Sequence, residues 1–232
     1  MQKIFHAIIG ALDAEISEFI RHLEKPRKNQ MGAFVFHEGQ FHGKDVVVVK
    51  SGVGKVFAAM TAQKLIDEYK PKWILFTGVA GGVNPTYNIG DIIVCRDCVQ
   101  HDLDATSLDF PRGQIPYTSY RYFETDIYLR KLAFEAPVEH VRHTGRILTG
   151  DQFLTQREMQ HYGYLKSELN GDAVEMEGAA VGQVCTINHI PFLIIRTISD
   201  KADGEAPENF NRFLPEIVKN SYQIVQYILK EY

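Results

Sequence analysis

Two carboxylates stand two residues apart in the segment Ala173-Val174-Glu175-Met176-Glu177-Gly178-Ala179. At the end of a strand, side chains at this spacing face the same side. A glutamate at a strand end is most often a solvated charge, but the flanking residues here are apolar. Carboxylates at a buried junction need polar partners, and the diol of a sugar is one candidate.

A second acidic group closes the segment Arg196-Thr197-Ile198-Ser199-Asp200, which follows the apolar run 191–195. Burial at the tip of a strand raises the pKa of a carboxylic acid, so Asp200 is a candidate proton donor near neutral pH. The alternative is that Ser199 or Asp200 caps a helix.

The glycine-rich turns do not match nucleotide-binding fingerprints. The segment Ser51-Gly52-Val53-Gly54-Lys55-Val56 lacks the spacing and the hydroxyl residue of a P-loop, and no G-x-G-x-x-G is present. We therefore expect neither a dinucleotide nor a triphosphate. Each turn still offers backbone N–H groups that can hold an oxygen atom or a water molecule.

Metal and redox chemistry have weak signals. Cys95 and Cys98 form a lone C-x-x-C, which we interpret as two thiols packed in or near a strand. The histidines are scattered without the spacing of a zinc-binding helix. For His101-Asp102 we expect a structural or pocket-shaping role, and we expect no metal and no cofactor.

Composition narrows the class of protein. Hydrophobic residues make up 45% of the 232 residues and charged residues 23%, as in a globular protein rather than a disordered one. The net charge is −4 with no long basic run, so we expect no nucleic-acid partner. No apolar run is long enough to span a bilayer, and the first residues do not resemble a signal peptide. We expect a cytoplasmic protein without a membrane contact.

Apolar runs and helix-period stripes alternate along the chain. Strands are expected at 3–10, 34–41, 45–50, 72–77, 92–99, 141–149, 172–175 and 191–198. Helices are expected from Leu12 to Pro26 and at 55–69, 126–135, 155–168, 178–189 and 207–232. This order predicts one α/β domain over 1–232, with three α/β/α layers and a mixed, mostly parallel, twisted central sheet. Ligands bind beyond the carboxyl ends of strands in such sheets, where the candidate residues stand.

Taken in order, these segments resemble the 5′-methylthioadenosine/S-adenosylhomocysteine nucleosidases of the nucleoside phosphorylase superfamily. The resemblance covers essentially the whole chain. The matching segments are Ile9-Gly10-Ala11 with Glu15, Ser51-Gly52-Val53-Gly54-Lys55-Val56, Thr77-Gly78-Val79-Ala80-Gly81-Gly82, Gly90-Asp91, His101-Asp102, Gly150-Asp151-Gln152-Phe153, Val174-Glu175-Met176-Glu177 and Arg196-Thr197-Ile198-Ser199-Asp200.

The resemblance implies a nucleoside phosphorylase-like fold and hydrolysis of the bond between adenine and ribose. Asp200, oriented by Ser199, would protonate adenine at N7. Glu15 would hold and deprotonate the attacking water, with Arg196 nearby. Glu177 would bind the ribose hydroxyls.

The resemblance also implies a set of binding contacts. Met176 would pack on the ribose, Phe153 would stack on adenine, and the backbone of Leu154 would read its Watson–Crick edge. Further substrate contacts would come from Val53, Val79, Ala80, Gly81, Val174 and Glu175. The apolar pocket for the 5′-substituent would involve Leu12, Ala105, Leu108 and Phe210, with Pro116 reaching into a neighbouring subunit. Val79 departs from the serine that many family members carry, which removes a hydroxyl from the water site.

Three alternatives stay open. A purine nucleoside phosphorylase of the same fold needs a cation for phosphate after the first strand, where this chain has Asp13 and Glu15. A related hydrolase acting on 6-amino-6-deoxyfutalosine, which also carries adenine on ribose, cannot be separated by sequence. A non-catalytic nucleoside-binding protein would be expected to lose Glu15 or Asp200.

A homodimer is expected as well. The resemblance implies one, and the segment 101–123 carries five aromatic residues that a soluble monomer would have to cover. The alternative is that this segment folds back on its own domain.

Overall fold

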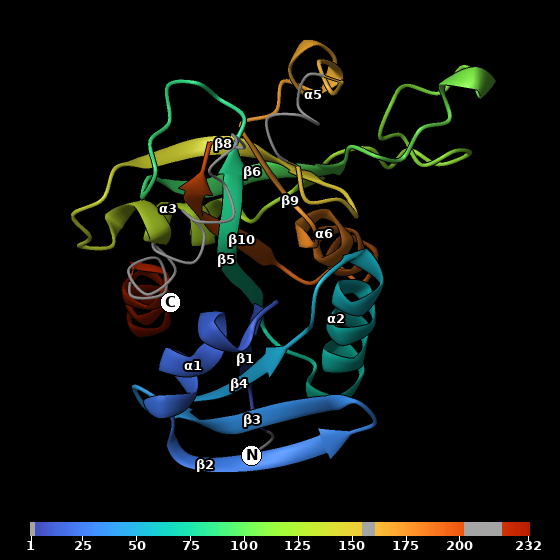
Figure 1. The fold of residues 1–232 in the computed structure, drawn as a ribbon. Helices are drawn as coiled ribbons and strands as arrows, with labels where there is room; N and C mark the ends of the chain where they lie inside the picture. The colour runs from blue at the N-terminus through green and yellow to red at the C-terminus, as the bar shows by residue number, and fades with distance from the viewer. Residues whose placement is uncertain (1–2, 155–160, 202–219) are drawn as a thin grey trace.

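The computed structural model describes residues 3–154, 161–201 and 220–232 (Figure 1). Within these residues, ten strands form one sheet: β1 (Phe5–Gly10), β2 (Glu24–Met31), β3 (Phe34–Phe41), β4 (Lys44–Lys50), β5 (Ile74–Gly82), β6 (Ile92–Gln100), β7 (Phe123–Glu124), β8 (Arg142–Thr149), β9 (Ala173–Glu175) and β10 (Phe192–Asp200). The helices are α1 (Asp13–Arg21), α2 (Lys55–Tyr69), α3 (Ile127–Glu135), α5 (Tyr164–Ser167) and α6 (Gly178–Ile187), with a 3-10 turn η1 (Thr106–Leu108) and a further helical segment at 220–231.

Strand β5 organises the sheet because it has three partners. Along one edge it pairs with β10 in parallel, from Ile74 opposite Phe192 onward. Its other edge pairs first with β1 and then, at Gly81 and Gly82, with β9. The pairings β10–β6, β6–β8, β8–β9, β9–β5 and β5–β10 therefore close a ring of strands.

The sheet is mixed, as expected, but the finer expectations are not confirmed. Five pairings are parallel and five are antiparallel, so the sheet is not mostly parallel. The three-layer arrangement is not confirmed either, because part of the sheet closes on itself in a barrel-like way. Repeating apolar runs reveal strands but not which strand edges meet.

Strand β2 is an element that the sequence did not predict. The helix expected to run to Pro26 ends at Arg21, and the polar segment Glu24–Met31 pairs with β3 at the edge of the sheet. The pairing is irregular between Glu24 and Arg27, the interval that holds Pro26. An edge strand tolerates proline and charge because one of its edges faces solvent. It also lacks the alternation that identifies half-buried strands.

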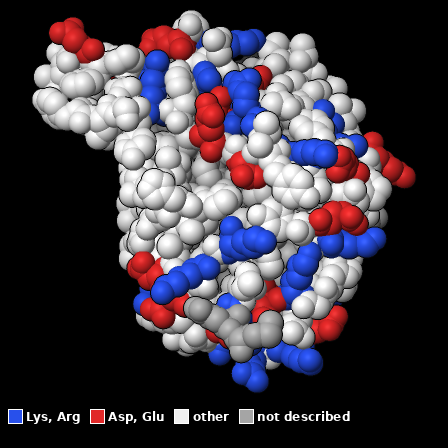
Figure 2. Space-filling model, turned by 180° about the vertical axis from the view of Figure 1, so that it is seen from behind, with Lys and Arg blue, Asp and Glu red and all other residues white. Residues whose placement is uncertain are grey.

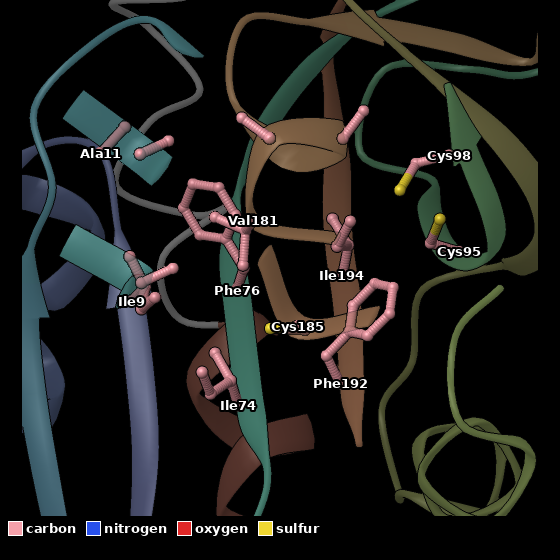
Figure 3. Packing of buried hydrophobic residues seen from close by; sticks show 14 of the residues in the cluster. Ile9, Ala11, Ile74, Phe76, Cys95, Cys98, Val181, Cys185, Phe192 and Ile194 are labelled. Atoms are coloured by element: carbon pink, nitrogen blue, oxygen red, sulfur yellow. The ribbon is translucent and has the colours of Figure 1, made fainter. Parts of the chain in front are cut away.

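Two hydrophobic clusters cover the two faces of the sheet. One contains side chains of α2 and α6, and Figure 3 shows Ile9, Phe76 and Val181 packed together within it. The other contains side chains of α1, α3 and the helical segment 220–231. Strands buried on both faces read as continuous apolar runs, as in Ile74–Phe76. Cys95, Cys98 and Cys185 are free, buried thiols.

The segment 101–122 projects from the body of the protein as an arm, at the upper right of Figure 1. Tyr117 in this arm is 86% exposed, and its ring contacts Phe110 edge to face. Ile115 and Tyr120 of the same segment pack against the core, and the guanidinium of Arg112 lies over the ring of Tyr164, so the arm leaves its own domain only in part. Within the described ranges, no helix is long and apolar enough to cross a membrane.

Candidate active site

A cavity of about 310 Å³ opens where several strands end. Its walls come from the segments after β1, β4, β8 and β9 and from the last residues of β5 and β10. The lining residues are Ala11, Leu12, Glu15, Val53, Val79, Ala80, Gly81, Gln152, Phe153, Leu154, Val174, Glu175, Met176, Glu177, Ser199 and Asp200. Most residues assigned from the sequence thus meet in one cavity, although they span the chain from 12 to 200.

Glu15 is a buried carboxylate held by backbone N–H groups. Its Oε2 accepts from Ala11 N at 2.7 Å and from Leu12 N at 2.9 Å, at the start of α1. Its Oε1 accepts from Val79 N at 3.2 Å. Burial raises the pKa of Glu15 above its usual value, while Arg196 and the three N–H groups oppose that rise. The side chain is therefore fixed in place as a potential base at the edge of the cavity.

Close packing behind Glu15 requires a glycine. A Cβ at Gly78 would lie 2.5 Å from Glu15 Oε1 and 3.2 Å from Arg196 Nη1. The space beside the Gly78 backbone is therefore taken up by the Glu15 carboxylate and the Arg196 guanidinium. Arg196 is fully buried behind the cavity and does not line it.

Glu175 and Glu177 both line the cavity, but β9 ends at Glu175, so the two-residue repeat of a strand does not extend to Glu177, and the two carboxyl groups have different partners. Glu175 Oε2 accepts from Arg196 Nη2 at 2.6 Å, and its carboxylate also accepts from Gly178 N and from the hydroxyl of Thr149. It therefore anchors the start of α6 and neutralises Arg196. This set of partners is structural.

Glu177 has a more open set of partners. Its Oε1 accepts from Gly54 N at 2.8 Å, across the cavity wall. Burial, followed by the charge of Glu175, raises the pKa of Glu177 to about 8. A carboxyl group with few partners in an apolar pocket is suited to meet a hydroxyl or a cationic group of a ligand.

Ser199 and Asp200 end β10 and are both buried. Ser199 Oγ donates to Asp200 Oδ2 at 2.8 Å, so the serine fixes the orientation of the carboxyl group. They are the last two residues of β10.

The remaining wall is apolar. Leu154 and Val174 are buried, Met176 is half-buried and Phe153 is half exposed at the mouth. Acidic and hydroxyl groups on one side and an aromatic ring with aliphatic groups on the other suit a flat heterocycle joined to a polar sugar. None of the described lining residues is a lysine or an arginine.

Some assigned residues lie elsewhere. Ala105, Leu108 and Pro116 belong to the projecting arm and do not line the cavity of their own chain. Phe210 lies outside the described residues. Ala11 and Gln152 line the cavity but were not assigned, although each stands inside a segment that carried the resemblance. The sequence signal that could have identified them is that they directly precede Leu12 and Phe153, which were assigned.

Comparisons with known proteins agree with this geometry. A family model for the phosphorylase superfamily matches residues 5–230. A 5′-methylthioadenosine/S-adenosylhomocysteine nucleosidase from Geobacillus sp. (strain WCH70) is 37% identical over 224 residues, covering 94% of this chain and 95% of the relative. The chain belongs to this nucleosidase family.

Solved structures extend the match to the fold. The nucleosidase of Colwellia psychrerythraea 34H in complex with adenine has a TM-score of 0.91 and 34% identity, covering 98% of this chain and 95% of that one. The futalosine hydrolase of Helicobacter pylori strain 26695 has a TM-score of 0.92 and 34% identity, covering 99% and 98%. The expected nucleoside phosphorylase-like α/β fold is therefore confirmed for this member of the nucleosidase family.

Proposed function

We propose that the chain hydrolyses the N-glycosidic bond of 5′-methylthioadenosine and S-adenosylhomocysteine. The products are adenine and a 5-substituted ribose, as methionine salvage and the recycling of S-adenosylmethionine by-products require. The same site accommodates 5′-deoxyadenosine and 6-amino-6-deoxyfutalosine as further candidate substrates, since each carries adenine on ribose. Support for the last comes from the similarity to a futalosine hydrolase.

Cleavage of this bond leaves negative charge on the base and positive charge on the sugar. In our proposal Asp200 donates a proton to adenine N7, and the hydrogen bond from Ser199 orients its carboxyl group. Phe153 stacks on the base and the backbone of Leu154 reads its Watson–Crick edge. A positioned acid of this kind contributes about 10²–10⁴ in rate.

The sugar end uses the two glutamates. Glu177 binds the ribose hydroxyls and, once ionised, favours the cationic sugar, while Met176 packs on the ring. Glu15 takes a proton from the water that attacks the anomeric carbon. The three N–H groups on Glu15 hold it in a fixed position for that water. Arg196 supports both carboxylates from behind the cavity.

One observation favours hydrolysis over phosphorolysis: the cavity wall carries the buried carboxylate of Glu15 and, among its described lining residues, no cation. Arg196 is already paired with Glu175. A phosphate dianion there would meet uncompensated negative charge, whereas neutral water would not.

The test is adenine release from 5′-methylthioadenosine in phosphate-free buffer, with mass analysis of the sugar product. We expect full activity without phosphate, a free sugar as product, and at least about 10²-fold lower turnover in Glu15→Gln. A phosphate requirement with a sugar 1-phosphate product would establish the phosphorylase alternative. Binding of the nucleoside without turnover would establish a non-catalytic binding protein.

We also propose that the protein is a cytoplasmic homodimer. Val56, Phe57 and Met60 expose apolar side chains along α2. In Figure 2 the arm at the upper left and the face below it carry few charged side chains. A second subunit covering this surface would receive Ala105, Leu108 and Pro116 at its own 5′-substituent pocket. Three free thiols suit a reducing compartment.

A further inference from the structure

Three charged residues outside the cavity form a closed ring of interactions. Lys55 Nζ donates to Asp102 Oδ1 at 2.7 Å, and Asp151 N donates to Asp102 Oδ2 at 3.0 Å. Lys55 N donates to Asp151 Oδ1 at 2.8 Å, which closes the ring. Each residue comes from a different segment: the start of α2, the residues after β6 and the turn after β8. None of the three lines the cavity.

The ring is connected to the sugar end of the site through Gly54. This residue directly precedes Lys55 and donates its N–H to Glu177 Oε1 at 2.8 Å. Gly54 has φ of +95°, and a Cβ there would lie 3.2 Å from Asp151 Oδ1. Its backbone is thus held between Asp151 and Glu177. Among the described residues, Gly54 N is the one group from another segment that donates to the carboxyl group of Glu177. A shift of Lys55 N would therefore move this donor.

The ring is connected to the base end through Asp151. Gln152, Phe153 and Leu154 follow it directly and line the cavity. Phe153 is half exposed, so packing alone does not fix its ring. The bond from Asp151 N to Asp102 fixes the start of this segment instead.

The charge on Asp102 is maintained by the ring itself. Burial opposes ionisation, but the hydrogen bonds from Lys55 and Asp151 lower the pKa of Asp102 below its usual value. Lys55 and Asp102 are mostly shielded, with side chains 19% and 32% exposed. Such a pair retains more of its attraction than one in open water.

We propose that Lys55, Asp102 and Asp151 are positioning residues that join the two ends of the site, Glu177 through Gly54 and the adenine-contacting segment through Asp151. This inference rests on the proposed nucleosidase function. A small displacement of a group that contacts substrate costs about 10²-fold in rate, so a ring that sets both ends controls catalysis without touching the substrate.

The test uses Asp102→Ala, with Lys64→Met as the control. Lys64 also lies on α2 and makes an ion pair with Glu68 at 2.6 Å, far from the ring. We expect Asp102→Ala to lower kcat for 5′-methylthioadenosine about 10–100-fold and to weaken adenine binding in calorimetry by about 10-fold. Lys64→Met is expected to change both by less than about two-fold. Lys55→Met should match Asp102→Ala, and Lys55→Arg should recover part of the loss.

A double variant separates positioning from a general loss of folding. If the ring acts through Glu177, Asp102→Ala adds little to the kcat loss of Glu177→Gln. If the ring only stabilises the fold, Asp102→Ala would instead lower the melting temperature and the binding stoichiometry. The kcat per competent site and the affinity for adenine would then be unchanged. That result would overturn the proposal. Should Asp102→Ala fail to fold, Asp102→Asn keeps the side-chain shape and tests the charge.

Failure of the proposed nucleosidase function can be distinguished from failure of the positioning role. In that case the unaltered protein would not release adenine in parallel assays. Adenine binding does not require turnover, so equal affinities of the unaltered protein and Asp102→Ala would by themselves contradict the role at the base end.

Discussion

Arg196 Nη2 donates to Glu175 Oε2 at 2.6 Å, and the two side chains are only 2% and 3% exposed. The carboxylates of Glu15 and Glu177 act on the same guanidinium and, with Glu175, raise the pKa of Arg196 despite its burial. Three acids thus depend on this arginine for their charge balance.

Arg196→Met should lower the free energy of unfolding by about 3–5 kcal/mol at pH 8, because a buried charge loses its partner. The loss should shrink at pH 5, where the carboxyl groups can take up protons. Chemical denaturation measures both. The control is Arg21→Met, which removes an exposed pair with Glu18 at 2.8 Å and should cost no more than about 1 kcal/mol. Equal losses in the two variants would contradict the account.

The pKa of about 8 at Glu177 predicts an acidic limb in kcat/KM, because the proposed role requires the ionised form. Activity should rise as the pH increases through about 8 and then level off. This rise should occur at a much higher pH than it would for a glutamate with an ordinary pKa. Glu177→Gln should remove this limb and lower kcat/KM by about 10²-fold. Glu168→Gln, at an exposed acid paired with Arg112, should leave the limb in place. A limb that persists in Glu177→Gln belongs to another group.

The same shift predicts how stability depends on pH. The folded pKa is above the unfolded value of 4.5, so the folded state binds more protons between the two. The contribution of Glu177 to stability is therefore full below pH 4.5 and declines as pH rises toward 8. In Glu177→Gln the free energy of unfolding should fall less over this interval and should exceed that of the unaltered protein at pH 8.

Asp200→Asn should abolish adenine release while folding and ligand binding are retained, because the amide keeps the shape but gives no proton to the base. Ser199→Ala should have a smaller effect, about 10-fold, since it removes only the hydrogen bond that orients Asp200. Initial rates and nucleoside affinity separate chemistry from binding. Substantial turnover by Asp200→Asn would exclude it as the general acid.

Pro116→Glu should weaken binding of long 5′-substituents more than binding of adenine, if the arm closes the pocket of a second subunit. Adenine should be least affected, because Phe153, Leu154 and Asp200 come from one chain. Light scattering at assay concentration gives the oligomeric state. A fully active monomer would rule out the shared pocket.

The sequence by itself determined which residues end the strands and carry chemistry. Apolar runs placed Ser199-Asp200 after a buried strand and Glu15 in the first turn of a helix. The ordered motifs then indicated the family. These features are local, because a run of apolar side chains and the polar group that ends it are neighbours in the chain.

Only the tertiary structure decided which of these groups pair. It separated Glu175, bonded to Arg196, from Glu177, bonded to Gly54. It closed the strands into a ring, added the edge strand β2 and carried Ala105, Leu108 and Pro116 away from their own cavity. Contacts between residues far apart in sequence depend on how strand edges meet and how the backbone turns between them. The periodicity of side chains along a single segment does not encode that information.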